Sequence, residues 1–327
     1  VNDQLSRIWQ YMYEGVNRAN YMIENKDKID FPRKNEMYGE VHFLRAFFYF
    51  ELVKIYGDVP LFTHGRLTAG DSGTLTRVPK SEVYAVIESD LNSAISALPA
   101  QKSTDGRATS FTAHALLGKV YLYQGKYSEA ANILEPLIGL YTLPSNPGSV
   151  FLVSGENGPE SVFEIQHSKE SNGWNWGWLP QSTEGNFGVI HHGIRGYNGP
   201  TYSSGWSFNV PTDEFHKAFK SGDKRRDASI LDIVKWADDN QADYQEGYEH
   251  TGYFNNKYIP RQGYSKNTTE LNYENNYRYI RYADVLLMAA EANNLSGNDV
   301  KARDYLNRVR FRAYGNNSQD SSASGSA

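Results

Sequence analysis

The sequence contains no cysteine among its 327 residues. This absence excludes a disulfide framework, a metal site built from thiolates and a cysteine nucleophile. It leaves the cellular compartment open, because proteins without cysteine occur in oxidising and in reducing spaces. The chain begins at Val1 and not at a methionine, so we expect a processed or trimmed chain, in which a missing signal peptide carries little weight.

Long apolar runs and clusters of basic residues are also absent. Arg45 and Glu51 interrupt the most hydrophobic stretch, so no segment is long enough to span a bilayer. The net charge is −5 and no group of Lys and Arg stands out, and we therefore expect no nucleic acid as a partner. Disorder is excluded by composition, because 15 Phe, 24 Tyr and 6 Trp are too many aromatic residues for a disordered chain.

The motifs of several enzyme classes are missing as well. We find no Gly-x-Ser-x-Gly nucleophile elbow, no Walker loop, no His-Glu-x-x-His zinc motif and no dinucleotide-binding glycine fingerprint. The adjacent His191 and His192 point to different sides and have no third ligand in register, so we expect neither a metal nor a cofactor. Carboxylates are plentiful, and the two acids of a glycoside hydrolase need only meet in space, which leaves such an enzyme as an alternative.

Apolar residues recur at helical spacing through the first part of the chain. Residues 5–25 carry one apolar stripe, and residues 41–56 are apolar nearly all round, which predicts a helix buried on most sides. Gly57 is positioned to end this second helix. Ser81 is the expected N-cap of a third helix, and a helical pair is expected from about 112 to 137.

The composition changes after residue 141. Gly, Asn, Ser, Pro and aromatic residues dominate the next part, which predicts loops with a few strands, such as 161–166, and a short helix at 213–220. Helical periodicity resumes near Tyr277. We therefore divide the chain into four parts: a helical scaffold with one repeat unit (1–141), a loop-rich and aromatic-rich insertion that is the candidate ligand surface (142–275), a second helical pair (276–315) and a flexible tail or truncation edge (316–327).

Two segments share the spacing of a tetratricopeptide (TPR) helix–turn–helix unit. Small residues let the two helices of such a unit approach each other, and a glycine permits the turn between them. The first segment contains Leu117, Gly118, Tyr121, Gly125, Tyr127, Ala130 and Leu134, and the second contains Ala289, Ala290, Asn293, Gly297, Ala302 and Leu306. The expected fold is mostly α: a TPR-like helical scaffold with a long loop-rich insertion carrying a few short strands.

Four ordered segments resemble the signature segments of the SusD/RagB family. They are Glu40–Phe50 followed by Tyr56–Leu61, Gly106–Thr109 followed by Ala115–Leu122, Phe219 with Asp223–Arg226, and Tyr279–Ala292. Proteins of this family are surface lipoproteins of the Bacteroidetes outer membrane, which bind nutrients, usually glycans, and deliver them to a SusC-like TonB-dependent transporter. The resemblance implies non-catalytic binding of an oligo- or polysaccharide for nutrient uptake. Binding of a peptide or another nutrient, and a scaffold that binds only protein, are the alternatives.

The resemblance also implies a location and an anchor. We expect a surface-exposed protein of the outer membrane, attached through a lipid upstream of Val1, because the family's mature proteins begin at a lipid-bearing cysteine. The family's C-terminal segment, rich in Glu-Arg and Glu-Gly, is not found after Ala313. We therefore expect part of the binding surface to lie outside this sequence.

A candidate binding element follows from the residues themselves. Trp174, Trp176 and Trp178 alternate with small or polar residues, and an extended segment would place the three indoles on one side. Tyr202 and Trp206 follow in a glycine-rich stretch. The apolar face of a sugar stacks on an aromatic ring, so these five residues are the predicted ligand-binding residues. The alternative is that the rings form the core of the insertion, because Trp is usually well buried.

Arg45 and Arg281 lie inside otherwise apolar helical segments. A buried arginine needs carboxylate partners. We expect both residues to form structural ion pairs rather than to bind a ligand.

Overall fold

The computed structural model describes residues 2–65, 67–73, 75–101, 104–170, 184–247, 249–266 and 271–315. The chain divides into two compact units. Unit 1 contains the described residues of 1–138 and 288–302, and unit 2 contains those of 139–287 and 303–315.

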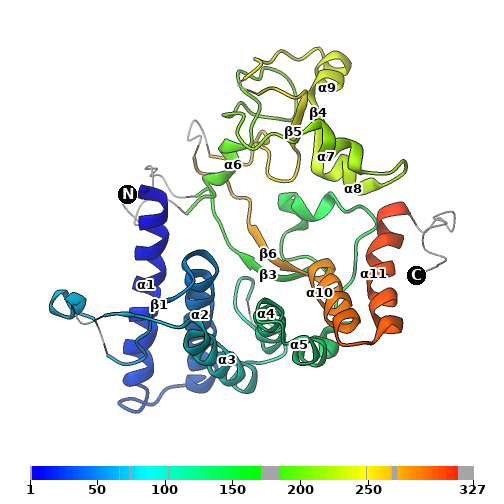
Figure 1. Cartoon of the computed structure of the whole chain (residues 1–327). Helices are drawn as coiled ribbons and strands as arrows, with labels where there is room; N and C mark the ends of the chain where they lie inside the picture. The colour runs from blue at the N-terminus through cyan, green and yellow to red at the C-terminus, as the bar shows by residue number, and fades with distance from the viewer. Residues whose placement is uncertain are drawn as a thin grey trace. The chain divides into compact units, whose positions relative to one another are not determined.

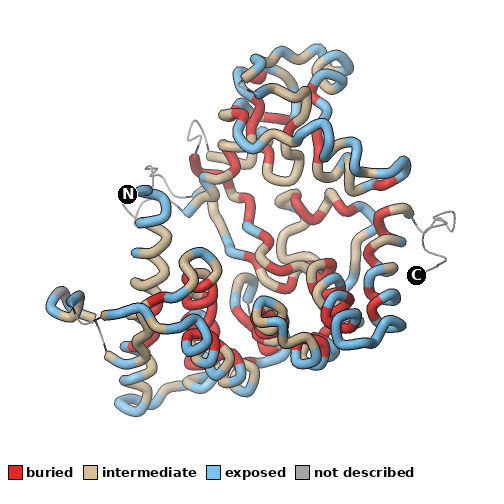
Figure 2. Tube along the Cα trace, viewed as in Figure 1, coloured by how far each residue is buried: buried red, intermediate tan, exposed pale blue. Residues whose placement is uncertain are grey.

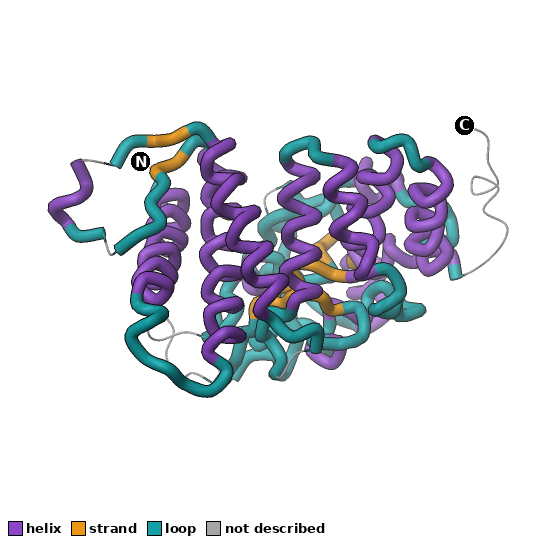
Figure 3. The backbone as a smooth tube through the Cα atoms, turned by 90° about the horizontal axis from the view of Figure 1, so that it is seen from below, coloured by secondary structure: helices purple, strands orange, loops and turns teal. Residues whose placement is uncertain are grey.

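Unit 1 is built from helices that pack against their neighbours in sequence. They are α1 (Asp3–Glu24), α2 (Lys34–Tyr56), α3 (Lys80–Ala97), α4 (Ser110–Tyr123) and α5 (Tyr127–Leu134). Each of these helices packs on the next, as Figure 1 and Figure 3 show. Two short strands, β1 (Val59–Pro60) and β2 (Arg77–Val78), pair antiparallel beside them. The expected order of helices in this part of the chain is therefore confirmed.

Helix α2 contributes many residues to the core of unit 1. Eleven of its 23 residues are buried, among them Phe43, Phe47 and Phe50, and Figure 2 shows red along this helix between intermediate and exposed positions. Its apolar character on nearly all sides had predicted this position. Gly57 follows the helix with φ of 70°, a left-handed conformation that favours glycine and ends the helix as predicted.

The N-terminus of α3 differs from the prediction. The helix begins at Lys80, after Pro79, so Ser81 lies inside the first turn and is not the N-cap. The backbone N–H of Lys80 instead donates to the carboxylate Oδ1 of Asp58, at 2.8 Å. A side chain that is distant in sequence therefore satisfies a free N–H of the first turn, which a search for local capping residues does not reveal.

The first TPR-like unit has the expected close contact. An ideal Cβ on Gly118 of α4 would lie 2.4 Å from Cδ2 of Leu134, so only glycine allows Leu134 to pack there. Gly125, with φ of 71°, makes the turn into α5. The small residues Ala130 and Ala131 then pack with Ala292 of α10 (Tyr282–Leu295). Gly297, with φ of 87°, separates α10 from α11 (Asp299–Tyr314).

A buried ion pair joins three helices of unit 1. The guanidinium of Arg45 donates to both carboxylate oxygens of Asp90 at 2.7 Å and to Oδ1 of Asn20 at 2.8 Å. His42 Nδ1 lies 2.7 Å from Asp90 Oδ1, and the backbone oxygen of Thr63 accepts a further bond from Arg45. The structural role predicted for Arg45 is thus confirmed, since its donors are engaged inside the core.

Unit 2 contains short elements separated by loops. Strands β3 (Ser161–Ile165) and β6 (Tyr277–Arg281) pair antiparallel, as do β4 (Ile230–Asp232) and β5 (Tyr253–Asn255). Its short helices are α6 (Gly188–His191), α7 (Asp213–Ala218), α8 (Lys224–Ser229) and α9 (Ile233–Asn240), and Figure 1 shows α7, α8 and α9 next to β4 and β5. The expectation of loops with a few strands and a short helix near 213–220 is confirmed.

The segment from Tyr277 is a strand and not the start of a helix, which corrects the sequence interpretation. Buried and more exposed residues alternate along β6, and this period of two suits pairing with β3. The helix begins at Tyr282. Arg281, at the end of the strand, forms ion pairs with Glu160 at 2.8 Å and Asp284 at 3.2 Å, so its predicted structural pairing is confirmed.

Two apolar clusters hold the loops of unit 2 together. One contains Ile194, Tyr197, Tyr202, Leu231, Ile233, Phe254 and Ile259, and the other contains Val189, Ile190, Leu271 and Tyr273. Within the described residues no helix is long and apolar enough to cross a membrane.

Candidate functional site

The predicted ligand-binding residues are placed in three different ways. Trp174, Trp176 and Trp178 lie outside the described residues. Tyr202 is only 4% exposed, and its ring packs edge-on against Trp236 with ring centroids 5.0 Å apart. The guanidinium of Arg261 lies 5.0 Å from the centroid of the Tyr202 ring. Tyr202 therefore belongs to the core of unit 2, and we do not include it in the candidate site.

Trp206 is half-buried and belongs to a group of rings at the surface. The centroid of His191 lies 4.9 Å from those of Trp206 and Phe187 and 5.8 Å from that of Phe208. Trp206 and Phe208 are 6.2 Å apart. Phe187 is 37% exposed and Phe208 is 55% exposed. We call these four residues the aromatic platform, because they present apolar ring surface to solvent in one place.

Backbone hydrogen bonds bring the two segments of the platform together. The N–H of Trp206 donates to the carbonyl oxygen of Ile190 at 3.0 Å, and that of Phe208 donates to His191 at 2.7 Å. The approach requires two glycines. An ideal Cβ on Gly205 would lie 2.3 Å from Cα of Gly193, so any larger side chain would force the segments apart.

The side chains next to the rings add hydrogen-bonding groups. Trp206 and Phe208 flank Ser207, whose Oγ accepts from the backbone N–H of Arg195 at 3.1 Å. Arg195 is exposed and donates through Nη2 to the backbone oxygen of Trp206 at 2.8 Å. A guanidinium carries five N–H donors, so Arg195 has others to offer a ligand beside the rings.

The platform carries no charge from its histidine at neutral pH. Burial lowers the pKa of His191, and it lowers that of His192, whose neighbour His191 acts in the same direction. A neutral imidazole keeps one nitrogen as donor and one as acceptor. Among the described residues, no group of three His, Asp or Glu side chains is arranged to hold a metal ion.

A polar hollow lies on the same segment of the chain as Phe187. It has a volume of about 450 Å³ and is lined by Gln166, His167, Ser168, Glu184 and Gly185. Burial lowers the pKa of His167, so this imidazole is also neutral at pH 7. Amide, hydroxyl, imidazole and carboxylate groups are suitable partners for the hydroxyls of a polar ligand.

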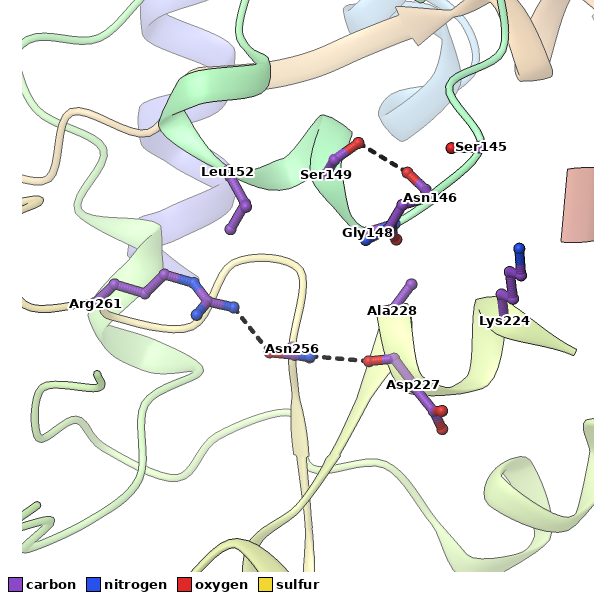
Figure 4. A pocket seen from close by; sticks show the side chains of 10 residues that line it. All are labelled: Ser145, Asn146, Gly148, Ser149, Leu152, Lys224, Asp227, Ala228, Asn256 and Arg261. Carbon is purple, nitrogen blue, oxygen red and sulfur yellow. Dashed lines mark hydrogen bonds between the residues drawn. The ribbon is translucent and has the colours of Figure 1, made fainter. Parts of the chain in front are cut away.

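A second, larger pocket is shown in Figure 4. It has a volume of about 530 Å³ and is lined by Ser145, Asn146, Gly148, Ser149, Leu152, Lys224, Asp227, Ala228, Asn256 and Arg261. Asn256 links two of these groups, since it accepts from Arg261 at 3.0 Å and donates to the backbone oxygen of Asp227 at 2.9 Å. The lining can bond hydroxyl groups, but it contains no aromatic ring.

Sequence reasoning did not identify the ring cluster that Phe187, His191 and Phe208 form with Trp206, and it did not identify the pocket of Figure 4. Both places combine residues from separate segments that share no motif. The one available signal was the density of glycine between 185 and 205, which allows segments to approach closely.

Comparisons with known proteins agree with this architecture. A family profile described as "Starch-binding associating with outer membrane" matches residues 1–122. A laminarin-binding SusD-like protein has a TM-score of 0.84 and 37% identity, and the match covers 94% of this chain and 70% of that protein. Surface glycan-binding protein A from Bacteroides thetaiotaomicron, solved in complex with laminarihexaose, has a TM-score of 0.81 and 26% identity, covering 94% of this chain and 68% of that one.

A curated relative has a lower sequence identity to this chain than the laminarin-binding protein has. A SusD-like protein of Formosa agariphila is 29% identical over 328 residues, which cover 95% of this chain and 63% of the relative. The chain thus spans less than two thirds of the length of this relative. A second profile, that of the SusD family, matches residues 159–326, slightly more than half of the chain. The sequence segments, the TPR-containing helical fold and this match show that the chain belongs to the SusD family.

Proposed function

We propose that this chain captures a glycan without cleaving it, and that the aromatic platform is the surface on which the sugar stacks. The single observation that carries the proposal is the platform: four rings from two segments, with Phe208 55% exposed, next to the exposed guanidinium of Arg195. Sugar faces stack on aromatic rings, and their hydroxyls bond to neighbouring polar groups.

The ligand class follows from the similar proteins. One similar structure is named a laminarin-binding protein, and another is bound to laminarihexaose. We therefore propose laminarin, or a glucan of the same kind, as the ligand. Delivery to a SusC-like TonB-dependent transporter, a lipid anchor and a place at the outer membrane are parts of the same proposal, supported by the description "associating with outer membrane" of the matching profile.

Retardation in a native gel that contains laminarin tests the capture of the glycan. We expect wild-type protein to be retarded, and Trp206→Ala and Phe208→Ala to be retarded less, because each stacked ring contributes about 0.5–1.5 kcal/mol. Phe215→Ala is the matched control, since Phe215 is 48% exposed on α7 and lies outside the platform. Retention of wild-type retardation by both platform variants would contradict the proposed site.

The tryptophans outside the described residues are tested in the same gel. At least one of Trp174→Ala, Trp176→Ala and Trp178→Ala should reduce retardation while the protein stays folded. The non-catalytic part of the proposal is tested by incubating the protein with laminarin and assaying for new reducing ends. Their appearance, with loss of the activity on replacement of one carboxylate, would establish a glycoside hydrolase instead.

A further inference from the structure

A third cavity of unit 2 has a lining that the proposed function does not use. It has a volume of about 330 Å³ and is lined by Leu143, Ser145, Lys224, Arg308, Phe311, Arg312 and Gly315. We call it the cationic pocket, because three of its lining residues are positively charged and none carries a carboxylate. Arg308, Phe311 and Arg312 lie three and four residues apart on α11, which places them on one face of that helix.

The ammonium group of Lys224 supplies a positive charge to this pocket. Within the described part of the chain it forms no ion pair and no hydrogen bond. An ideal Cβ on Gly315 would lie 3.1 Å from Nζ of Lys224, so the group lies against the end of α11. Figure 4 shows the side chain of Asp227 pointing in the opposite direction from that of Lys224. The positive charge is therefore available to a ligand.

Arg312 leaves a buried donor without a partner. Its side chain is only 6% exposed, and Nη1 donates to Oε2 of Glu160 at 2.8 Å. Its Nε, in contrast, is buried and has no hydrogen-bond partner among the described residues. A buried N–H without an acceptor is costly, so a small shift of the Arg312 side chain that brings Nε to an acceptor atom of a ligand would be favourable here. Arg308 pairs with Asp304 at 2.7 Å but stays 41% exposed at the rim.

The remaining lining suits a sugar ring. Phe311 is 44% exposed and offers a ring face, and Ser145 offers a hydroxyl. A volume near 330 Å³ lies at the lower end of the roughly 300–1,000 Å³ of ligand pockets, which fits one small ring rather than a longer chain. The pocket of Figure 4 shares Ser145 and Lys224 with the cationic pocket, and its polar lining can accept neighbouring sugar residues.

We propose that the cationic pocket binds an acidic sugar residue, one that carries a carboxylate or a sulfate ester. The acidic group accepts hydrogen bonds from Lys224 and Arg308 and, after a small shift of the Arg312 side chain, from its free Nε, and the ring packs on Phe311. This proposal goes beyond the capture of a glucan on the aromatic platform, because a neutral glucan carries no acidic group. The two proposals rest on different residues and fail independently.

Two methyl glycosides that differ in one group test the proposal. Methyl β-glucuronide carries a carboxylate where methyl β-glucoside carries a hydroxymethyl group. Binding is followed by ligand-observed NMR at low ionic strength, where screening of charges is weakest. We expect the glucuronide to bind wild-type protein and the glucoside to bind at least about tenfold more weakly, as expected for charge-assisted hydrogen bonds.

Substitutions locate the site. Lys224→Met and Arg308→Gln should each weaken glucuronide binding by about tenfold, because both side chains are exposed and can be changed without loss of the fold. Lys220→Met is the matched control: it removes the same charge four residues earlier and leaves the pocket lining unchanged. Thermal unfolding checks that the variants remain folded.

Three results would overturn the proposal. The first is equal binding of the glucuronide and the glucoside to wild-type protein. The second is unchanged glucuronide binding by both Lys224→Met and Arg308→Gln. The third is inorganic sulfate that binds as tightly as the glucuronide and displaces it, which would show a site for a free oxyanion and not for a sugar.

Discussion

Replacement of Arg45 by Met tests how the core of unit 1 is held together. The variant removes the two bonds to Asp90 and the bond to Asn20, each 2.7–2.8 Å long in the native protein. It leaves the carboxylate of Asp90, whose side chain is 3% exposed, without its guanidinium partner and next to His42. Breaking one side of a buried ion pair costs about 3–5 kcal/mol, a large share of the stability of a typical domain.

A double variant separates the loss of the pair from the loss of packing. Arg45→Met combined with Asp90→Leu removes both charges, so no carboxylate stays buried without its partner. We expect the double variant to unfold at a higher urea concentration than Arg45→Met alone, because replacing a whole buried pair by apolar residues costs less than breaking it. The free energy of unfolding is measured by urea denaturation followed by far-UV circular dichroism.

An exposed ion pair in the same unit is the control. Lys301 and Glu135 lie 2.8 Å apart, and both side chains are nearly half exposed. Lys301→Met should change the free energy of unfolding by less than about 1 kcal/mol. A loss of less than about 1 kcal/mol in the free energy of unfolding of Arg45→Met would refute this account of the core. So would strictly additive losses, in which the double variant is less stable than Arg45→Met by as much as Asp90→Leu alone destabilises the native protein.

Three further outcomes are expected. Phe47→Ala should lower the free energy of unfolding, measured by urea denaturation, by about 3–5 kcal/mol, because Phe47 is only 8% exposed. Leu44→Ala on the same helix should lower it far less, because Leu44 is 42% exposed. Similar losses for the two variants would contradict the burial described for α2. Gly118→Val should destabilise the protein by about 1–3 kcal/mol and lower its melting temperature, because the new side chain clashes with Leu134. Gly73→Val, whose Cβ would meet no neighbouring atom, should leave the melting temperature unchanged. An unchanged melting temperature for Gly118→Val would contradict the tight contact between the helices. Burial lowers the pKa of His167 and His192, so the unfolded chain binds more protons than the folded one below about pH 6.5. The free energy of unfolding should therefore fall as the pH drops from 7 through the folded pKa values, and the double variant with His167→Gln and His192→Gln should show a weaker dependence of the melting temperature on pH. A wild-type melting temperature that does not change with pH would contradict this prediction.

Much of the helical scaffold could be predicted from the sequence. Periodicity of apolar residues is a local property, and it placed α2 from residue 41, its end at Gly57 and the turn at Gly125 correctly, although α2 begins at Lys34. What it did not supply is long-range pairing. The need of Arg45 for a carboxylate was evident, but Asp90, 45 residues away, could be identified only in the structure. The same limit explains why β6 was interpreted as part of a helix, because its partner strand β3 lies more than a hundred residues earlier in the chain.

The candidate site was predicted only in part. Trp206 could be named because it is an aromatic residue in a glycine-rich stretch, but the same argument also selected Tyr202, which is buried. Burial depends on which segments meet, and Trp206 and Phe208 lie beside His191 because Gly193 and Gly205 let their segments approach. The cationic pocket draws on three segments of the chain, and only the one that contains Lys224 belongs to a segment that the sequence analysis singled out.

Titration of laminarihexaose into the protein by isothermal calorimetry tests the central claim most directly. We predict binding by wild-type protein with a Kd on the order of micromolar to millimolar, as expected for a few stacked rings on an open surface. Trp206→Ala and Phe208→Ala should each weaken the affinity by about twofold to tenfold, and the double variant by more, while Phe215→Ala binds like wild type. Wild-type affinity in the folded double variant would contradict the claim that the aromatic platform binds the glycan.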